Sequence, residues 1–104
     1  MSFELQESIV SEYGEIRGLI HLPNRELNNK GLIVILHGYF SSDRRGPAKL
    51  YVQIARKMSD LGNVVLRFDC IGFGDSTGEF KDVTFPSAER DFRKVIEYAM
   101  KRLI

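Results

Sequence analysis

The sequence has little of three features that define whole classes of protein: cysteine, long apolar runs, and an excess of charge of one sign. Its single cysteine, Cys70, excludes an internal disulfide, is typical of a reducing compartment, and is expected to be a buried, inert thiol. The longest apolar run is Leu32 to Leu36, whereas a membrane-spanning helix needs about 20 such residues. Fifteen basic and fourteen acidic residues leave a net charge of +1, so no basic surface for nucleic acid or an anionic membrane is expected.

Motifs for metals, cofactors and export are missing as well. The two histidines and the cysteine are scattered along the chain, and such a spacing predicts no metal site. Gly72 to Thr77 matches a dinucleotide-binding fingerprint only in part, because Thr77 stands where the third glycine belongs, and no P-loop is present. Met1 to Val10 carries acids instead of a basic and then an apolar segment, so no signal peptide is expected. We therefore expect a cytoplasmic protein without cofactor or metal, and with neither nucleic acid nor membrane as a partner.

What the sequence does contain is the composition of a globular domain. Of its 104 residues, 43% are hydrophobic and 28% are charged, which is ordinary for a folded protein. A chain of this length can bury a hydrophobic core. No internal repeat or linker divides the sequence, so we expect residues 1–104 to form one domain.

The first half of the chain has the periodicity of strands. Phe3 to Val10 and Ile16 to Leu22 alternate between apolar and polar residues on either side of a turn, as in an antiparallel hairpin. His21, within the second run, is expected to be an ordinary residue of a strand face. Gly31 to Gly38 is apolar at both parities, which is typical of a strand covered by helices on both sides.

The second half alternates helix and strand. Apolar residues recur at helical spacing between Leu50 and Leu61, and Asn63 to Asp69 is a second strand of the buried type. After a glycine-rich loop, Pro86 opens a helix whose apolar stripe contains Ala88, Phe92, Val95, Ile96, Ala99, Met100 and Leu103. The order β-β-β-α-β-α predicts an α/β fold with a mixed sheet, in which an antiparallel hairpin precedes parallel strands with flanking helices.

The residues at the ends of the two buried strands carry a family resemblance. His37-Gly38 ends the first strand, and Asp69 begins a loop that contains Gly72, Gly74, Ser76 and Gly78. In this order, and with a helix to follow, the chain resembles the N-terminal portion of α/β-hydrolase serine esterases of the cinnamoyl/feruloyl esterase, monoacylglycerol lipase and serine aminopeptidase-like type. The hairpin fits the first strands of that family.

The resemblance implies an oxyanion hole, the set of N–H groups that stabilises negative charge on a reacting carbonyl oxygen. The backbone N–H of Tyr39 is the expected donor, with Phe40 as the second choice, in a loop ordered by His37 and Gly38. Tyr39, Phe40 and Phe73 are expected to line the substrate pocket, although packing of the loops on one another explains these aromatic residues equally well. The remaining family residues are expected to shape a tight structural loop: Asp69, Gly72, Gly74, Asp75, Ser76 and Gly78.

Gly74 to Gly78 formally matches the G-x-S-x-G motif of a nucleophilic serine. That motif requires a strand, the serine and a helix in immediate succession, so that the hydroxyl is presented at the helix start. Ser76 lies several residues beyond the strand, and residues 79–85 separate it from the helix. We therefore expect Ser76 to be a loop residue, while an enzyme that uses it as the nucleophile is the least favoured interpretation.

Two functional interpretations remain. In the first, the chain is the N-terminal half of a carboxylic ester hydrolase that supplies the oxyanion loop and a pocket wall, while the catalytic triad lies on other polypeptide and the chain alone is inactive. Its substrate would then be a small ester or amide, bound once the protein is complemented. In the second, the chain is a non-catalytic, self-associating module. Both predict that the exposed edge along Leu32–Leu36 pairs with a complementing C-terminal half or a second copy.

Overall fold

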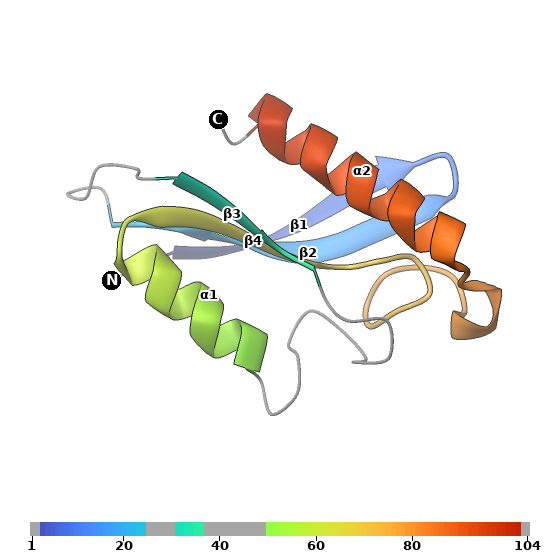
Figure 1. The fold of residues 1–104 in the computed structure, drawn as a ribbon, viewed down its shortest axis with the longest axis horizontal. Helices are drawn as coiled ribbons and strands as arrows, with labels where there is room; N and C mark the ends of the chain where they lie inside the picture. Colours follow the sequence, from blue (N-terminus) through green and yellow to red (C-terminus); the bar gives the residue numbers. More distant parts are fainter. Residues whose placement is uncertain (1–2, 25–30, 37–49, 103–104) are drawn as a thin grey trace.

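The computed structural model describes residues 3–24, 31–36 and 50–102 of the chain. Its elements follow the predicted order, with a short 3-10 helix that the sequence did not predict (Figure 1). They are β1 (Phe3–Ser11), β2 (Gly14–Leu22), β3 (Gly31–Ile35), α1 (Leu50–Asp60), β4 (Asn63–Asp69), η2 (Phe80–Asp82) and α2 (Phe85–Arg102).

The four strands form one mixed sheet in the order β1-β2-β4-β3. β1 and β2 form the predicted antiparallel hairpin, with Ser11 opposite Gly14 at the turn. β4 runs antiparallel to β2 and parallel to β3, so it occupies the middle of the sheet, and among the described residues β3 is an edge strand. The predicted fold class is confirmed.

Helices α1 and α2 lie on opposite faces of this sheet (Figure 1). Alternate residues of β4 supply the two faces, because successive side chains of a strand point in opposite directions. Leu66 and Phe68 pack with Val95 and Ala99 of α2 in the main hydrophobic core. On the other face Val65 is fully buried, and α1 covers β4 with Ala55 and Ser59.

The predicted helix stripes are only partly buried. In α2, Val95 and Ala99 are buried, whereas Ile96 and Met100 from the same predicted stripe are exposed. In α1, Ile54 is likewise exposed. Nothing in the described residues covers these side chains, and in that part of the chain the sheet ends at β3. No described helix combines the length and the apolar character needed to cross a membrane.

Candidate functional site

The candidate site lies where β3 and β4 end side by side. Because these strands are parallel, their carboxyl ends meet at one edge of the sheet, the edge at which open α/β sheets bind ligands. The predicted site residues belong to two segments, the first after β3 and the second the loop after β4. Those of the first segment, namely His37, Gly38, Tyr39 and Phe40, lie outside the described residues, so their roles stay predictions.

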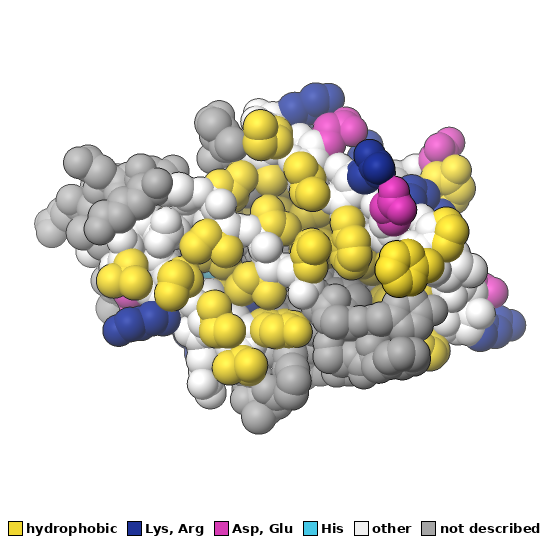
Figure 2. Space-filling view, in the orientation of Figure 1, with side chains coloured by type: hydrophobic (Ala, Val, Ile, Leu, Met, Phe, Trp, Pro, Cys, Tyr) yellow, Lys and Arg dark blue, Asp and Glu magenta, His cyan; other side chains and the backbone are white. Residues whose placement is uncertain are grey.

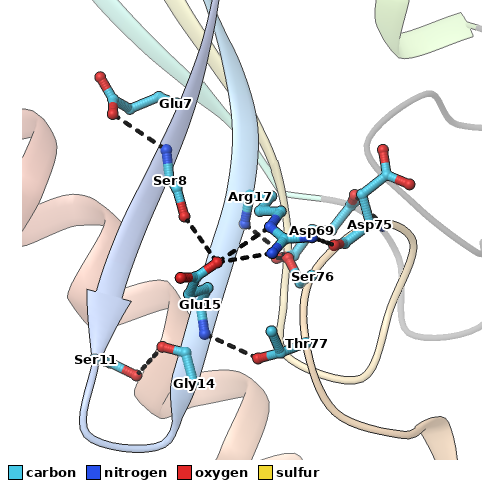
Figure 3. A network of polar contacts seen from close by, with 10 residues as sticks. All are labelled: Glu7, Ser8, Ser11, Gly14, Glu15, Arg17, Asp69, Asp75, Ser76 and Thr77. Carbon is cyan, nitrogen blue, oxygen red and sulfur yellow. Dashed lines mark hydrogen bonds and ion pairs between the residues drawn. The ribbon is translucent and has the colours of Figure 1, made fainter.

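In the loop after β4, the hydroxyl of Ser76 is fully engaged by the backbone of two strands. Its Oγ donates a hydrogen bond to the carbonyl oxygen of Asp69 at the end of β4. The same oxygen accepts a hydrogen bond of 2.8 Å from the backbone N–H of Arg17 on β2 (Figure 3). With the residue only 8% exposed, this hydroxyl fastens the loop to the sheet.

The carboxylate of Asp69 is enclosed by the loop that follows it. Oδ2 accepts a hydrogen bond of 3.0 Å from the backbone N–H of Asp75, and the side chain is fully buried. Gly74 lies against the same carboxylate at φ +47°, where an added Cβ would come within 2.4 Å of Oδ2. Only glycine therefore allows the loop to fold this closely around the carboxylate.

Contacts from β2 hold the outer side of the loop (Figure 3). The Arg17 guanidinium donates to the carbonyl oxygen of Asp75 over 3.0 Å and forms an ion pair of 2.8 Å with Glu15. Thr77 Oγ1 accepts a hydrogen bond of 2.9 Å from the backbone N–H of Glu15, and the Thr77 carbonyl accepts one of 2.8 Å from Gly72. The structure thus brings together the loop residues that the family resemblance singled out.

A buried carboxylate on α2, which sequence reasoning missed, anchors the start of this loop. Asp91 is 1% exposed, and its Oδ2 accepts a hydrogen bond of 2.9 Å from the backbone N–H of Ile71. Its Oδ1 forms an ion pair of 3.1 Å with Arg90, whose guanidinium carbon lies 3.9 Å from the centroid of the Tyr13 ring. The position of Asp91 between Ala88 and Val95, on the buried side of the helix, was the signal available in the sequence.

Two aromatic residues pack against each other beside the loop. The rings of Phe73 and Phe80 meet edge to face with centroids 5.3 Å apart. Phe73, expected to line a substrate pocket, is 5% exposed, whereas Phe80 is 54% exposed. Of these two rings, Phe80 presents the larger surface to solvent.

Cys70 and His21 are also chemically reactive side chains, and both are fully buried. Burial raises the pKa of the Cys70 thiol far above its ordinary value, so the sulfur stays protonated and is a poor nucleophile. His21 lies on a face of β2, as expected, where it is fully buried and accepts a hydrogen bond from Arg67. Within the described ranges, no group of three or more histidine, cysteine or acidic residues is placed to hold a metal ion.

A surface groove of about 590 Å³ lies away from the strand ends, between the hairpin turn and α2. Its lining mixes both signs of charge, with Glu12 and Glu89 near Arg93 and Lys94. Arg93 is already paired with Glu89 over 3.0 Å. Such a lining gives no preference for an anionic or a cationic ligand.

Comparison with known proteins gives similarity at the level of structure. No protein-family model and no curated protein matches the sequence. Est1E from Butyrivibrio proteoclasticus, solved with bound ferulic acid, superimposes with a TM-score of 0.76 at 25% identity, over 91% of this chain and 37% of that one. The α/β hydrolase GrgF from Penicillium gives a TM-score of 0.75 at 18% identity, over 96% and 33%. XC6422 from Xanthomonas campestris, an α/β serine hydrolase without a lid, gives 0.72 at 20%, over 95% and 45%. This chain therefore spans less than half the length of each of these structures.

Proposed function

Because the chain has the fold of the N-terminal part of an α/β hydrolase, we propose that it is the N-terminal half of a serine hydrolase that cleaves small carboxylic esters or amides. The order of the strands in the sheet is the main observation behind this proposal. In β1-β2-β4-β3, two parallel strands end at one edge, and a closely hydrogen-bonded loop follows the second of them. This is the architecture shared with Est1E and with the serine hydrolase XC6422.

The loop after β3 supplies the oxyanion hole in this proposal. Acyl transfer places negative charge on the carbonyl oxygen, and backbone N–H groups fixed in advance stabilise that charge without reorganisation. The Tyr39 N–H is the proposed donor, with that of Phe40 as the alternative. The loop of residues 70–78 supports this role, since its hydrogen bonds to β2 and β4 hold it as a wall at the same edge of the sheet.

An acyl or aromatic group is the proposed substrate moiety next to that wall. Phe73 and Phe80 form an aromatic pair beside the loop, and Phe80 is largely exposed. Tyr39 and Phe40 would face them from the other loop. The ferulic acid in the Est1E structure is an aromatic acid, which agrees with an aromatic contribution to the wall.

The nucleophile, its base and its acid are proposed to lie on polypeptide that pairs with β3. Both neighbours of β4 are taken by β2 and β3, and α2 lies on the face opposite α1. A right-handed crossover through α2 therefore leads back past β3, to a position parallel to it. The strand placed there would cover Leu32–Leu36.

The surface around β3 supports this pairing. Apolar side chains gather in a continuous band over α2, β3 and α1 (Figure 2). The exposed large apolar residues of α1, of α2 and at the end of β3 in the described part of the chain are Leu36, Leu50, Ile54, Phe85, Ile96 and Met100. A strand followed by an amphipathic helix would cover both the open edge and the adjoining helix faces. A cytoplasmic location completes the proposal, in agreement with the single, buried cysteine.

Removing one backbone N–H at a time tests the oxyanion hole. In the complemented protein, Tyr39→Pro deletes the proposed donor, whereas Tyr39→Ala keeps the N–H and removes only the side chain. We expect Tyr39→Pro to lower kcat for a short p-nitrophenyl ester by about 100-fold or more, while Tyr39→Ala changes mainly KM. Phe40→Pro distinguishes the second choice. Full activity in both proline variants would contradict the proposed loop.

The band around β3 also supports the alternative of a non-catalytic, self-associating module. Native mass spectrometry of the chain, with and without a complementing segment, separates the two. A heteromeric complex that hydrolyses the ester supports the hydrolase. A homo-oligomer that does not bind the segment and does not hydrolyse the ester favours the non-catalytic module. A monomer with an ordered sheet would contradict pairing along β3 in either form.

A further inference from the structure

A buried polar contact joins β2 to β4 beneath α1. The Arg67 Nε donates a hydrogen bond of 2.9 Å to Nε2 of His21, and the two residues are 2% and 0% exposed. Because Nε2 accepts this hydrogen bond, it carries no proton. The ring is therefore the neutral tautomer with its proton on Nδ1.

Charged groups from three elements act on this ring. Arg67 comes from β4, and Glu4 of β1 stands directly opposite His21 in the strand register. Arg56 of α1 binds Glu4 through two hydrogen bonds, of 3.0 and 3.4 Å. In the described part of the chain the ring thus has two cations and one carboxylate around it, and that carboxylate is already held by α1.

The side of α1 that covers the sheet offers little to a charged ring. Its buried residues are Ala55 and Ser59. The Nδ1 of His21 and the Oγ of Ser59 are both buried without a hydrogen-bond partner among the described residues. Burial, and next the charge of Arg67, lower the pKa of His21, and the opposing effect of Glu4 does not restore its ordinary value.

We propose that the His21–Arg67 contact makes the attachment of α1 to the sheet sensitive to pH, so that α1 is held while His21 is neutral and is released when the ring gains a proton. A protonated Nε2 becomes a donor and can no longer accept from Arg67. The new cation also competes with Arg56 for Glu4, and that ion pair is the link between α1 and β1. The inference is independent of the proposed hydrolase, because its tests measure amide exchange and ring titration.

The direction of the effect follows from proton linkage. The folded ring binds its proton more weakly than the ring of an open state, whose ordinary pKa is 6.5. The contact is therefore fully formed above that value and is lost as the pH falls below it. Between the open-state and folded pKa values, the equilibrium constant for opening should rise by up to about tenfold per pH unit.

Hydrogen exchange of the full chain from pH 8 to pH 5, corrected for intrinsic rates, tests this inference. We expect opening of the α1 amides to be constant above about pH 6.5 and then to rise, while the α2 amides give the internal reference. His21→Gln can still accept from Arg67 but does not titrate, so its α1 opening should be independent of pH over this range. His37→Gln, which removes the other histidine, should behave like the parent. A flat parent profile, or an unchanged rise in His21→Gln, would overturn the inference.

NMR titration of the unmodified chain keeps the test decisive if a variant does not fold. The ring nitrogen and carbon shifts should show the Nδ1–H tautomer of His21 at pH 8 and a pKa below 6.5. An Nε2–H tautomer, or a pKa at or above that ordinary value, would refute the contact.

Discussion

The two strands on either side of β4, β2 and β3, differ in how closely the described residues pack around them. On the β2 side, the two strands approach closely at Gly18, where an added Cβ would lie 2.2 Å from the Arg67 carbonyl oxygen. Ser76 and Asp69 tie the following loop to the same two strands. On the β3 side, the strand is only half-buried, and both helices carry exposed apolar residues such as Ile54 and Ile96.

This difference separates two kinds of stabilisation within one small sheet. The β2 side combines buried apolar residues such as Ile16 and Ile20 with polar contacts between residues far apart in sequence. On the β3 side, part of the apolar surface stays exposed in the described residues. In the proposed hydrolase, the hydrogen-bonded loop next to β2 would form a wall of the site, and the edge of β3 would pair with the strand that carries the nucleophile.

Placing a methyl group at Gly18 should produce the largest loss on the β2 side. We expect Gly18→Ala to lower the free energy of unfolding by about 3 kcal/mol, because the backbones of β2 and β4 must move apart. Gly31→Ala on β3 is the matched control, since its nearest atom would lie 3.4 Å away. It should change stability by less than about 0.5 kcal/mol. Urea denaturation followed by circular dichroism measures the free energy of unfolding of both variants. Equal losses of stability would show that the two sides of β4 are packed alike.

Two adjacent positions of α2 sharpen the contrast between buried and uncovered surface. Val95 is 0% exposed and Ile96 is 48% exposed. Val95→Ala should cost about 2 kcal/mol through lost burial. In the chain alone Ile96→Ala should cost clearly less than that, but it should weaken binding of a complementing segment. The same denaturation experiment, with titration of the segment, measures both effects; a larger stability loss at Ile96 would show that its face is already covered.

Removing the loop hydroxyl should have a smaller effect. Ser76→Ala leaves the part-buried N–H of Arg17 and the carbonyl oxygen of Asp69 without this hydroxyl, at an expected cost of about 1.5 kcal/mol. Ser8→Ala removes a hydroxyl on an exposed part of β1 and should stay within about 0.5 kcal/mol. Thermal or urea unfolding compares the two variants. If Ser76→Ala were as stable as Ser8→Ala, the proposed fastening of the loop would be wrong.

The ion pair between α1 and β1 should contribute least. Arg56→Gln should cost less than about 1 kcal/mol, because the pair is partly exposed to solvent. The hydrogen bond from Arg56 lowers the pKa of Glu4. The contribution is therefore present above the ordinary Glu4 value of 4.5 and is lost as the pH falls below it. Unfolding of Arg56→Gln and of the neighbouring control Lys57→Gln at pH 7 and pH 3.5 tests this, and a difference that persists at the lower pH would contradict it.

Local sequence patterns predicted the element order and the burial of β4, because periodicity reports which residues face a core. They overestimated the burial of β3, which is only half-buried in the described residues. They predicted neither the burial of His21 and Arg67 nor the anchoring role of Asp91. Their hydrogen-bond partners lie far away in the sequence, and periodicity does not identify such partners. The stripe of α2 shows the same limit: Ile96 and Val95 are equally apolar, but only the topology determines which of them this chain covers.

The proposed hydrolase function depends most on the claim that the attacking serine lies on other polypeptide. Labelling with a fluorophosphonate, mapped by peptide mass spectrometry alongside hydrolysis of a short p-nitrophenyl ester, tests it directly. The account predicts no label and no turnover for the chain alone, and both for the complemented protein, with the label on a serine of the partner segment. A label on Ser76 of the isolated chain, together with turnover, would contradict it.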